Sequence, residues 1–184
     1  MLVEFSKFVK KHSVYKWIHW NMRDSNYGFE AINNRLRILG GQPFDIHDDL
    51  KYDLPRVLGK IYTYGYERNQ PKGRLLNLAE RNRITTKEAL TGQEEADAFT
   101  NKEYLRLHIS TLRKVDIIDS LIERVEKGKL KVNASRKEIY GLTVMGVLEI
   151  IRSTSWLIFL VSILGYIIGA ALEPIVQKLL GTGN

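Results

Sequence analysis

An uncharged segment near the carboxyl end, residues 153–172, limits most strongly how this sequence can fold. It reads STSWLIFLVSILGYIIGAAL and consists mainly of aliphatic and aromatic side chains. A helix of this length is about 30 Å long, which matches the hydrocarbon core of a bilayer. The sequence therefore predicts a membrane-spanning helix and argues against a freely soluble enzyme.

Charge is concentrated before this segment. The chain has 28 Lys and Arg and 21 Asp and Glu, a formal net charge of +7, and after Arg152 the only charged residues are Glu173 and Lys178, which cancel. The first 152 residues therefore carry the whole excess. Such an excess attracts nucleic acid, anionic lipid or phosphorylated ligands, although it can also serve solubility alone.

The flanks of the segment predict its orientation. The amino terminus lacks an apolar run of signal-peptide length, and Lys and Arg lie mostly before residue 153. The positive-inside rule then places the large N-terminal domain in the cytoplasm, in a single-pass protein. The chain has no cysteine, which excludes disulfides and Cys-ligated metals. We expect neither a metal site nor a cofactor.

Apolar residues at three- and four-residue steps predict an all-α protein. The expected parts are a helical ligand-binding domain over 1–134, a juxtamembrane helix over 135–152, the transmembrane helix over 153–172 and a short tail over 173–184. Within the first domain the pattern predicts helices over 3–20, 24–39, 55–64, 72–82 and 92–127. Thr91 and Glu94 form a capping-box pattern, and Ser135 can cap the juxtamembrane helix.

The long helix carries an apolar stripe. Its members recur at steps of three and four: Leu105, Ile109, Leu112, Val115, Ile118, Ile122 and Val125. Such a stripe forms either the core of a helical bundle or a contact between subunits. We expect the core.

Gly165 and Gly169 form a small-xxx-small pair within the membrane segment. Small residues allow the backbones of membrane helices to approach closely, so the pair predicts a homo-oligomer, a tetramer or larger. Several copies could enclose a pore with Glu149 and Arg152 at its cytoplasmic mouth. An ordinary surface pair would explain the same two residues.

Basic and aromatic residues alternate in two stretches, 17–27 and 56–83. Cations bind phosphates and aromatic faces stack on bases, which is the chemistry of a single-stranded nucleic acid or nucleotide site. The predicted phosphate-binding residues are Arg23, Lys60, Arg68, Lys72 and Arg74. The predicted stacking residues are Trp20, Tyr62 and Tyr64. A third polar set lies on the long helix: His108, Ser110, Thr111, Arg113 and Lys114. Packing and a solvated charged face would explain the same patterns.

Catalytic motifs are weak. His19 and Asp24 have the His-x4-Asp spacing of membrane acyltransferases, but the glycine-rich phosphate loop of those enzymes is missing. None of the four histidines has the upstream arginine of a HEPN-type ribonuclease. We expect a non-enzyme. One alternative is a membrane-anchored hydrolase or nuclease that uses His19, Arg23 and Asp24, or His108; another is a non-catalytic tail-anchored adaptor.

A small basic helical sensor joined to one self-associating membrane segment resembles the membrane effectors of bacterial anti-phage systems, in particular the transmembrane channel effector of the Hailong system. The resemblance is one of architecture and extends over the whole chain. It implies an oligomeric channel of the bacterial inner membrane, gated by single-stranded DNA oligomers that a partner nucleotidyltransferase makes.

Overall fold

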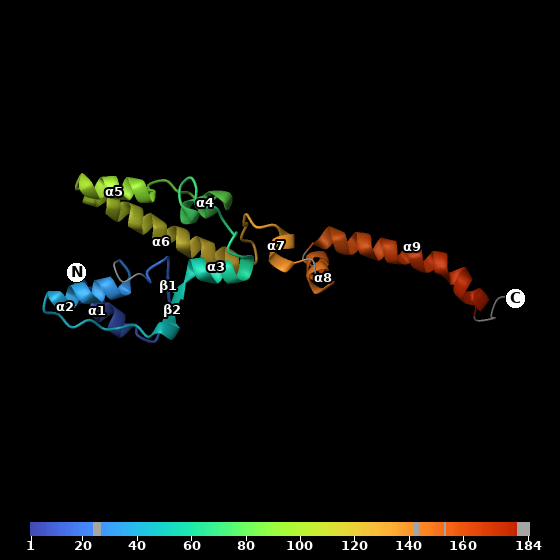
Figure 1. Ribbon diagram of the computed structural model, residues 1–184, viewed down its shortest axis with the longest axis horizontal. Coiled ribbons are helices and arrows are strands. Elements are labelled where there is room, and N and C mark those ends of the chain that lie inside the picture. Colours follow the sequence, from blue (N-terminus) through green and yellow to red (C-terminus); the bar gives the residue numbers. More distant parts are fainter. Residues whose placement is uncertain (24–26, 142–143, 153, 180–184) are drawn as a thin grey trace. The chain divides into compact units, whose positions relative to one another are not determined.

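The computed structural model describes residues 1–23, 27–141, 144–152 and 154–179 (Figure 1). The described residues are mostly helical, as predicted, with 62% helix and 4% strand. The chain divides into two compact units, Met1–Ala134 and Ser135–Asn184.

The first unit combines helices with one short parallel strand pair. Its elements, in chain order, are α1 (Leu2–Lys11), β1 (Trp17–His19), α2 (Phe29–Ile38), the 3-10 turn η1 (Asp48–Leu50), β2 (Lys51–Asp53), α3 (Leu54–Tyr62), α4 (Arg74–Arg81), α5 (Gly92–Thr100) and α6 (Tyr104–Glu126).

The strand pair corrects the predicted helix over 3–20, because α1 already ends at Lys11. Trp17, Ile18 and His19 pair in parallel with Lys51, Tyr52 and Asp53. Aromatic and β-branched residues favour strands where a partner is available. Helical periodicity cannot reveal that partner, because it lies more than thirty residues further along the chain.

The predicted helix over 92–127 is divided in two. The Thr91–Glu94 capping box is present at the start of α5. Lys102 adopts a left-handed conformation with φ of 57°, and the Glu103 amide donates to the Ala98 carbonyl over 2.8 Å. This turn ends α5 and lets α6 run back alongside it (Figure 1).

The core of the first unit lies between α3, α4 and α6, and it includes fully buried Leu58, Leu78, Ile117 and Leu121. Buried Asn82 at the end of α4 joins this core to the segment after α6. Its side chain donates to the carbonyl of Lys131 and accepts from the amide of Lys131, both over 2.8 Å.

The first half of the apolar stripe on α6 is exposed, so the prediction of a bundle core is wrong there. Leu105 is 73% and Leu112 is 54% exposed, whereas Ile118, Ile122 and Val125 pack against the core. The reason is the position of α5. It covers the Ser110 side of α6, where the Ser110 hydroxyl donates to Glu95.

The second unit contains α7 (Arg136–Tyr140), α8 (Val144–Arg152) and α9 (Ser155–Leu179). Ser135 and Glu138 form a capping box, but the predicted single helix over 135–152 is wrong. Gly141 ends α7 with φ of +74°. A Cβ added at Gly146 would lie 2.2 Å from the Tyr140 carbonyl oxygen, so α8 packs tightly against the end of α7.

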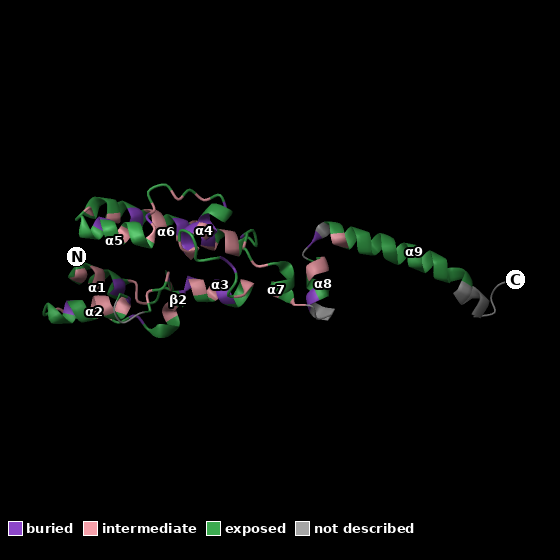
Figure 2. Cartoon of the chain, turned by 45° about the horizontal axis from the view of Figure 1, so that its top comes forward, coloured by how far each residue is buried: buried purple, intermediate pink, exposed green. Residues whose placement is uncertain are grey.

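Helix α9 is the only candidate membrane span among the described residues. Its stretch Trp156–Pro174 is apolar enough to cross a bilayer and none of it is buried (Figure 2). The helix extends beyond the predicted boundary at residue 172 and accommodates Pro174 internally. A Cβ at Gly165 or Gly169 would meet no atom within 4 Å, so the small-residue face is open.

We expect Leu121→Ala to lower the free energy of unfolding by about 2–5 kcal/mol, because it leaves a cavity in the core. The exposed Leu112→Ala should cost less than about 0.5 kcal/mol. Urea unfolding of the full chain in detergent, followed by tryptophan fluorescence, measures both. Equal losses would show that residue 112 belongs to a core after all.

Candidate functional site

A cleft of about 640 Å³ in the first unit brings together three segments that are distant in the sequence. The first is the stretch around β1, residues 17–22; the second is the loop and first turn of α4, residues 69–76; the third is the face of α6 that carries Thr111, Lys114, Val115 and Ile118. This volume falls within the range of small-ligand sites.

Aromatic residues line one side of the cleft: Phe5, Trp17, Trp20 and Phe29. Trp20 also packs partly against the core. The indole nitrogen of Trp17 is buried and has no hydrogen-bond partner among the described residues. A buried donor without an acceptor costs the fold about 1–3 kcal/mol.

Cations come from the α4 and α6 segments. Lys72 forms an ion pair with Glu80 over 2.6 Å, and Lys114 forms one with Glu95 over 2.7 Å. Arg74 has no carboxylate partner within the described part of the chain and lies over the Tyr66 ring, 5.7 Å from its centroid. Arg74 is therefore the cation of the cleft that is most available to an anionic ligand.

The loop before α4 is held in place by Asn77. Its side-chain amide donates to the carbonyls of Arg68 and Gln70, each over 2.9 Å. This fixes Asn69 and Lys72 at the edge of the cleft without the help of a ligand. Asn69 adds an amide that is able to pair with a base edge.

The β1 side is held by the carboxylate of Asp53, the last residue of β2, which is only 4% exposed. Its Oδ1 accepts from the Asn21 amide over 2.9 Å, and its Oδ2 forms an ion pair with Arg23 Nε at 2.6 Å. Asn21 adopts a left-handed conformation with φ of 56°. These contacts fix the turn that places Trp20 beside the cleft.

His19 is buried next to this carboxylate, with Nδ1 3.5 Å from Asp53 Oδ1. The Met22 amide donates to Nδ1 over 3.2 Å, so the ring proton of the neutral imidazole lies on Nε2. Burial lowers the pKa of His19, and the charge of Asp53 opposes that shift only in part. A neutral ring whose Nδ1 is occupied is a poor general base, and this geometry gives His19 a structural role.

Of the residues predicted for a hydrolase, His19 and Arg23 lie near each other, because both contact Asp53. Asp24 lies outside the described residues. His108 lies exposed on α6. Among the described residues, no group of three His, Cys, Asp or Glu side chains is placed to hold a metal ion.

Arg23 and Lys60 line a second cavity, of about 530 Å³. Its lining is of mixed charge, because its four cations are accompanied by three carboxylates, Glu30, Asp48 and Asp53. Lys51 is paired with Asp48 over 2.8 Å. This cavity is less suited to a polyanion than the cleft.

The predicted ligand residues thus fall into three groups. Trp20, Lys72 and Arg74 line the cleft. Arg23 and Lys60 line the second cavity. Tyr62, Tyr64 and Arg68 line neither. Thr111 and Lys114, which belong to the third polar set of the sequence analysis, also line the cleft, whereas His108 and Arg113 of that set do not. Trp17 and Asn69 lie within the two predicted stretches but were not among the chosen ligand residues.

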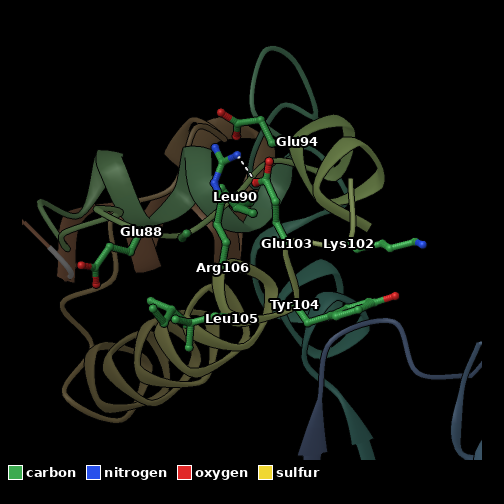
Figure 3. Close-up of a pocket in the computed structure, with 10 residues that line it drawn as sticks. Glu88, Leu90, Glu94, Lys102, Glu103, Tyr104, Leu105 and Arg106 are labelled. Atoms are coloured by element: carbon green, nitrogen blue, oxygen red, sulfur yellow. Dashed lines mark hydrogen bonds and ion pairs between the residues drawn. The ribbon is translucent and has the colours of Figure 1, made fainter. Parts of the chain in front are cut away.

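A third cavity, of about 650 Å³, lies between the start of α6 and the loop before α5 (Figure 3). Three carboxylates line it, Glu88, Glu94 and Glu103, against Lys102 and Arg106. Arg106 pairs with Glu103 over 2.9 Å. Its carboxylates outnumber its cations, so the lining does not favour a phosphate-bearing ligand.

Comparison of the chain with protein-family models, with curated proteins and with solved structures finds no match.

The buried His19 predicts a pH dependence of stability. Its pKa in the folded protein is below the ordinary value of 6.5, so the unfolded chain binds the proton more readily. The free energy of unfolding should therefore fall as the pH is lowered through about 6.5. Urea titrations from about pH 7.5 to about 5.5 should show this slope, reduced in His19→Gln and retained in His108→Gln. An unchanged slope in His19→Gln would show that His19 is not the source of the pH dependence.

Proposed function

We propose that this chain is an oligomeric membrane effector. Its first unit is the receptor for a phosphate-bearing aromatic ligand, a single-stranded DNA oligomer or a nucleotide. Several copies of α9 form a channel that the ligand gates. The expected setting is anti-phage defence at the bacterial inner membrane, with the first unit in the cytoplasm and a nucleotidyltransferase as the source of the ligand, as in the effectors that the chain resembles.

The observation that carries this proposal is the composition of the cleft. One side supplies indole and phenyl rings, and the other supplies Lys72, Arg74 and Lys114. A nucleotide needs both kinds of contact, because its base stacks on aromatic faces and its phosphate binds cations. Glu95 is the one carboxylate of the lining, so the cations exceed the acids by two.

The membrane part is supported by the exposure of α9 and of α6. The span is apolar and entirely exposed, and Gly165 and Gly169 leave room for a neighbouring backbone. The exposed half of the α6 stripe adds a second apolar surface that a neighbouring copy could cover. In an oligomer, a ligand gates the channel only if it binds the open and closed arrangements unequally.

Ligand binding is tested with short fluorescent single-stranded oligonucleotides and the full chain in detergent. We expect Arg74→Gln to weaken binding roughly 10-fold, from the loss of about 1.5 kcal/mol in one charge-assisted contact. The dependence of log K on log salt should become shallower by about one phosphate contact. Lys87→Gln removes an exposed cation outside the cleft and is the matched control.

Equal weakening by Arg74→Gln and Lys87→Gln would indicate attraction by general surface charge and would refute the cleft as the binding site. The same variants test gating in dye-loaded vesicles. Addition of the oligonucleotide should change the leakage rate through the wild-type chain, and the same change should need roughly 10-fold more oligonucleotide with Arg74→Gln.

Self-association is tested at the small-residue face of α9. Isoleucine at Gly165 and Gly169 should prevent close approach of the helices and reduce the mass of the detergent-solubilised particle. Light scattering coupled to size exclusion measures that mass. Gly65→Ala, in the first unit and outside the span, is the control, because a Cβ at this position makes only an ordinary van der Waals contact. An unchanged mass in the Gly165→Ile/Gly169→Ile variant would show that the copies do not associate through this face.

A further inference from the structure

Helix α8 has the sequence pattern of an amphipathic helix. Positions 144, 147, 148 and 151 recur at the spacing that places residues on one helix face, and each is aliphatic. Glu149 lies outside that face, and Arg152 lies at its edge. A helix with one apolar face requires something apolar against it.

Two residues of this face are exposed in the second unit, Val147 at 43% and Leu148 at 55%. Gly146, on the other side of α8, is buried against the end of α7, where it closely approaches the carbonyls of Tyr140 and Gly141. The tight contact with α7 therefore fixes α8 with Val147 and Leu148 facing away from the contact.

The short connection between α8 and α9 limits how far this face can lie from the membrane. Only residues 153 and 154 separate α8 from α9. Three successive Cα–Cα steps reach at most about 11 Å. If α9 spans a bilayer, as the proposed function requires, the end of α8 cannot be further than that from the membrane surface. The aliphatic face of α8 is then within reach of the acyl chains.

The flanking residues match an anionic membrane surface. Arg136 and Lys137 are exposed on α7, and Arg152 is exposed at the end of α8. The carboxylate of Glu138, the next residue after Lys137, is engaged in the capping box with Ser135. Trp156 is 63% exposed at the start of α9, which is the position of an interfacial aromatic belt.

We propose that α8 is an interfacial helix that lies in the plane of the membrane surface. Val147, Leu148 and Ile151 enter the boundary between headgroups and acyl chains, and Arg136, Lys137 and Arg152 bind the phosphates of anionic phospholipids. The inference rests on the proposed membrane span of α9 but not on the ligand. It places Glu149 and Arg152 at the level of the lipid headgroups around each copy.

The chain contains no cysteine, so single cysteines introduced into it carry a probe at one known position. Leu148→Cys tests the apolar face of α8, Glu149→Cys tests its polar side, and Phe159→Cys tests the span. Each full-length variant is labelled with an environment-sensitive fluorophore and reconstituted into vesicles of phosphatidylcholine with phosphatidylglycerol. Emission and quenching by lipid-attached and by aqueous quenchers are then measured.

We expect a blue shift and quenching from the lipid at positions 148 and 159, and aqueous quenching at position 149. A probe at 148 that behaves like that at 149, while 159 is in lipid, would overturn the interfacial helix and leave the span intact. Aqueous quenching at 159 would refute the span and the inference with it.

The anionic component is tested separately. In Arg136→Gln/Lys137→Gln the blue shift at position 148 should lose its dependence on phosphatidylglycerol. In Lys129→Gln/Lys131→Gln, a matched double change in the first unit, that dependence should persist. Retention of the dependence in the first variant would exclude the α7 cations as the lipid-binding groups.

Discussion

The buried carboxylate of Asp53 is the constraint on which the cleft depends. It ends β2 and directly precedes α3, whose leucines enter the core. It also receives the Asn21 amide and Arg23 from the segment after β1. A buried charge is tolerated only when it is paired and hydrogen-bonded. Asp53 therefore joins the amino-terminal segment to the helical core and sets the position of the aromatic side of the cleft.

The cleft combines two kinds of chemistry that arise from different parts of the chain. The rings come largely from the amino-terminal segment and the cations from α4 and α6. Two of those cations are already paired with Glu80 and Glu95, so an anion binding there exchanges partners instead of meeting bare charges. Breaking these ion pairs would reduce the affinity of the proposed ligand. Arg74 would then be the main cation that selects a phosphate.

The second unit has a comparable division of roles. Gly141 and Gly146 have structural roles that require the absence of a side chain, because one adopts a positive φ and the other closely approaches the α7 backbone. Gly165 and Gly169 meet nothing in the described structure, and their small size remains available for contact with another helix. The four glycines thus divide into a pair that shapes α7 and α8 and a pair on the open face of α9.

Local signals in the sequence predicted local structure well. The capping boxes at Thr91 and Ser135 and the apolar segment that becomes α9 are properties of neighbouring residues. Pairings over long distances were not predictable. The sequence pattern predicted a helix at Trp17, whereas the structure has a strand there, because Trp17 pairs with Lys51. The exposure of Leu105 depends on where α5 packs. Likewise, Lys72 and Arg74 were visible as cations, but their convergence with Lys114 depends on the tertiary fold.

Ligand binding in the cleft can be measured by photo-crosslinking, with the full chain in lipid nanodiscs and a short single-stranded oligonucleotide that carries 4-thiothymidine. We expect crosslinks within residues 17–22 and 69–76, competed by unlabelled oligonucleotide. Crosslinks that avoid both segments, or none at all, would contradict the proposed binding site.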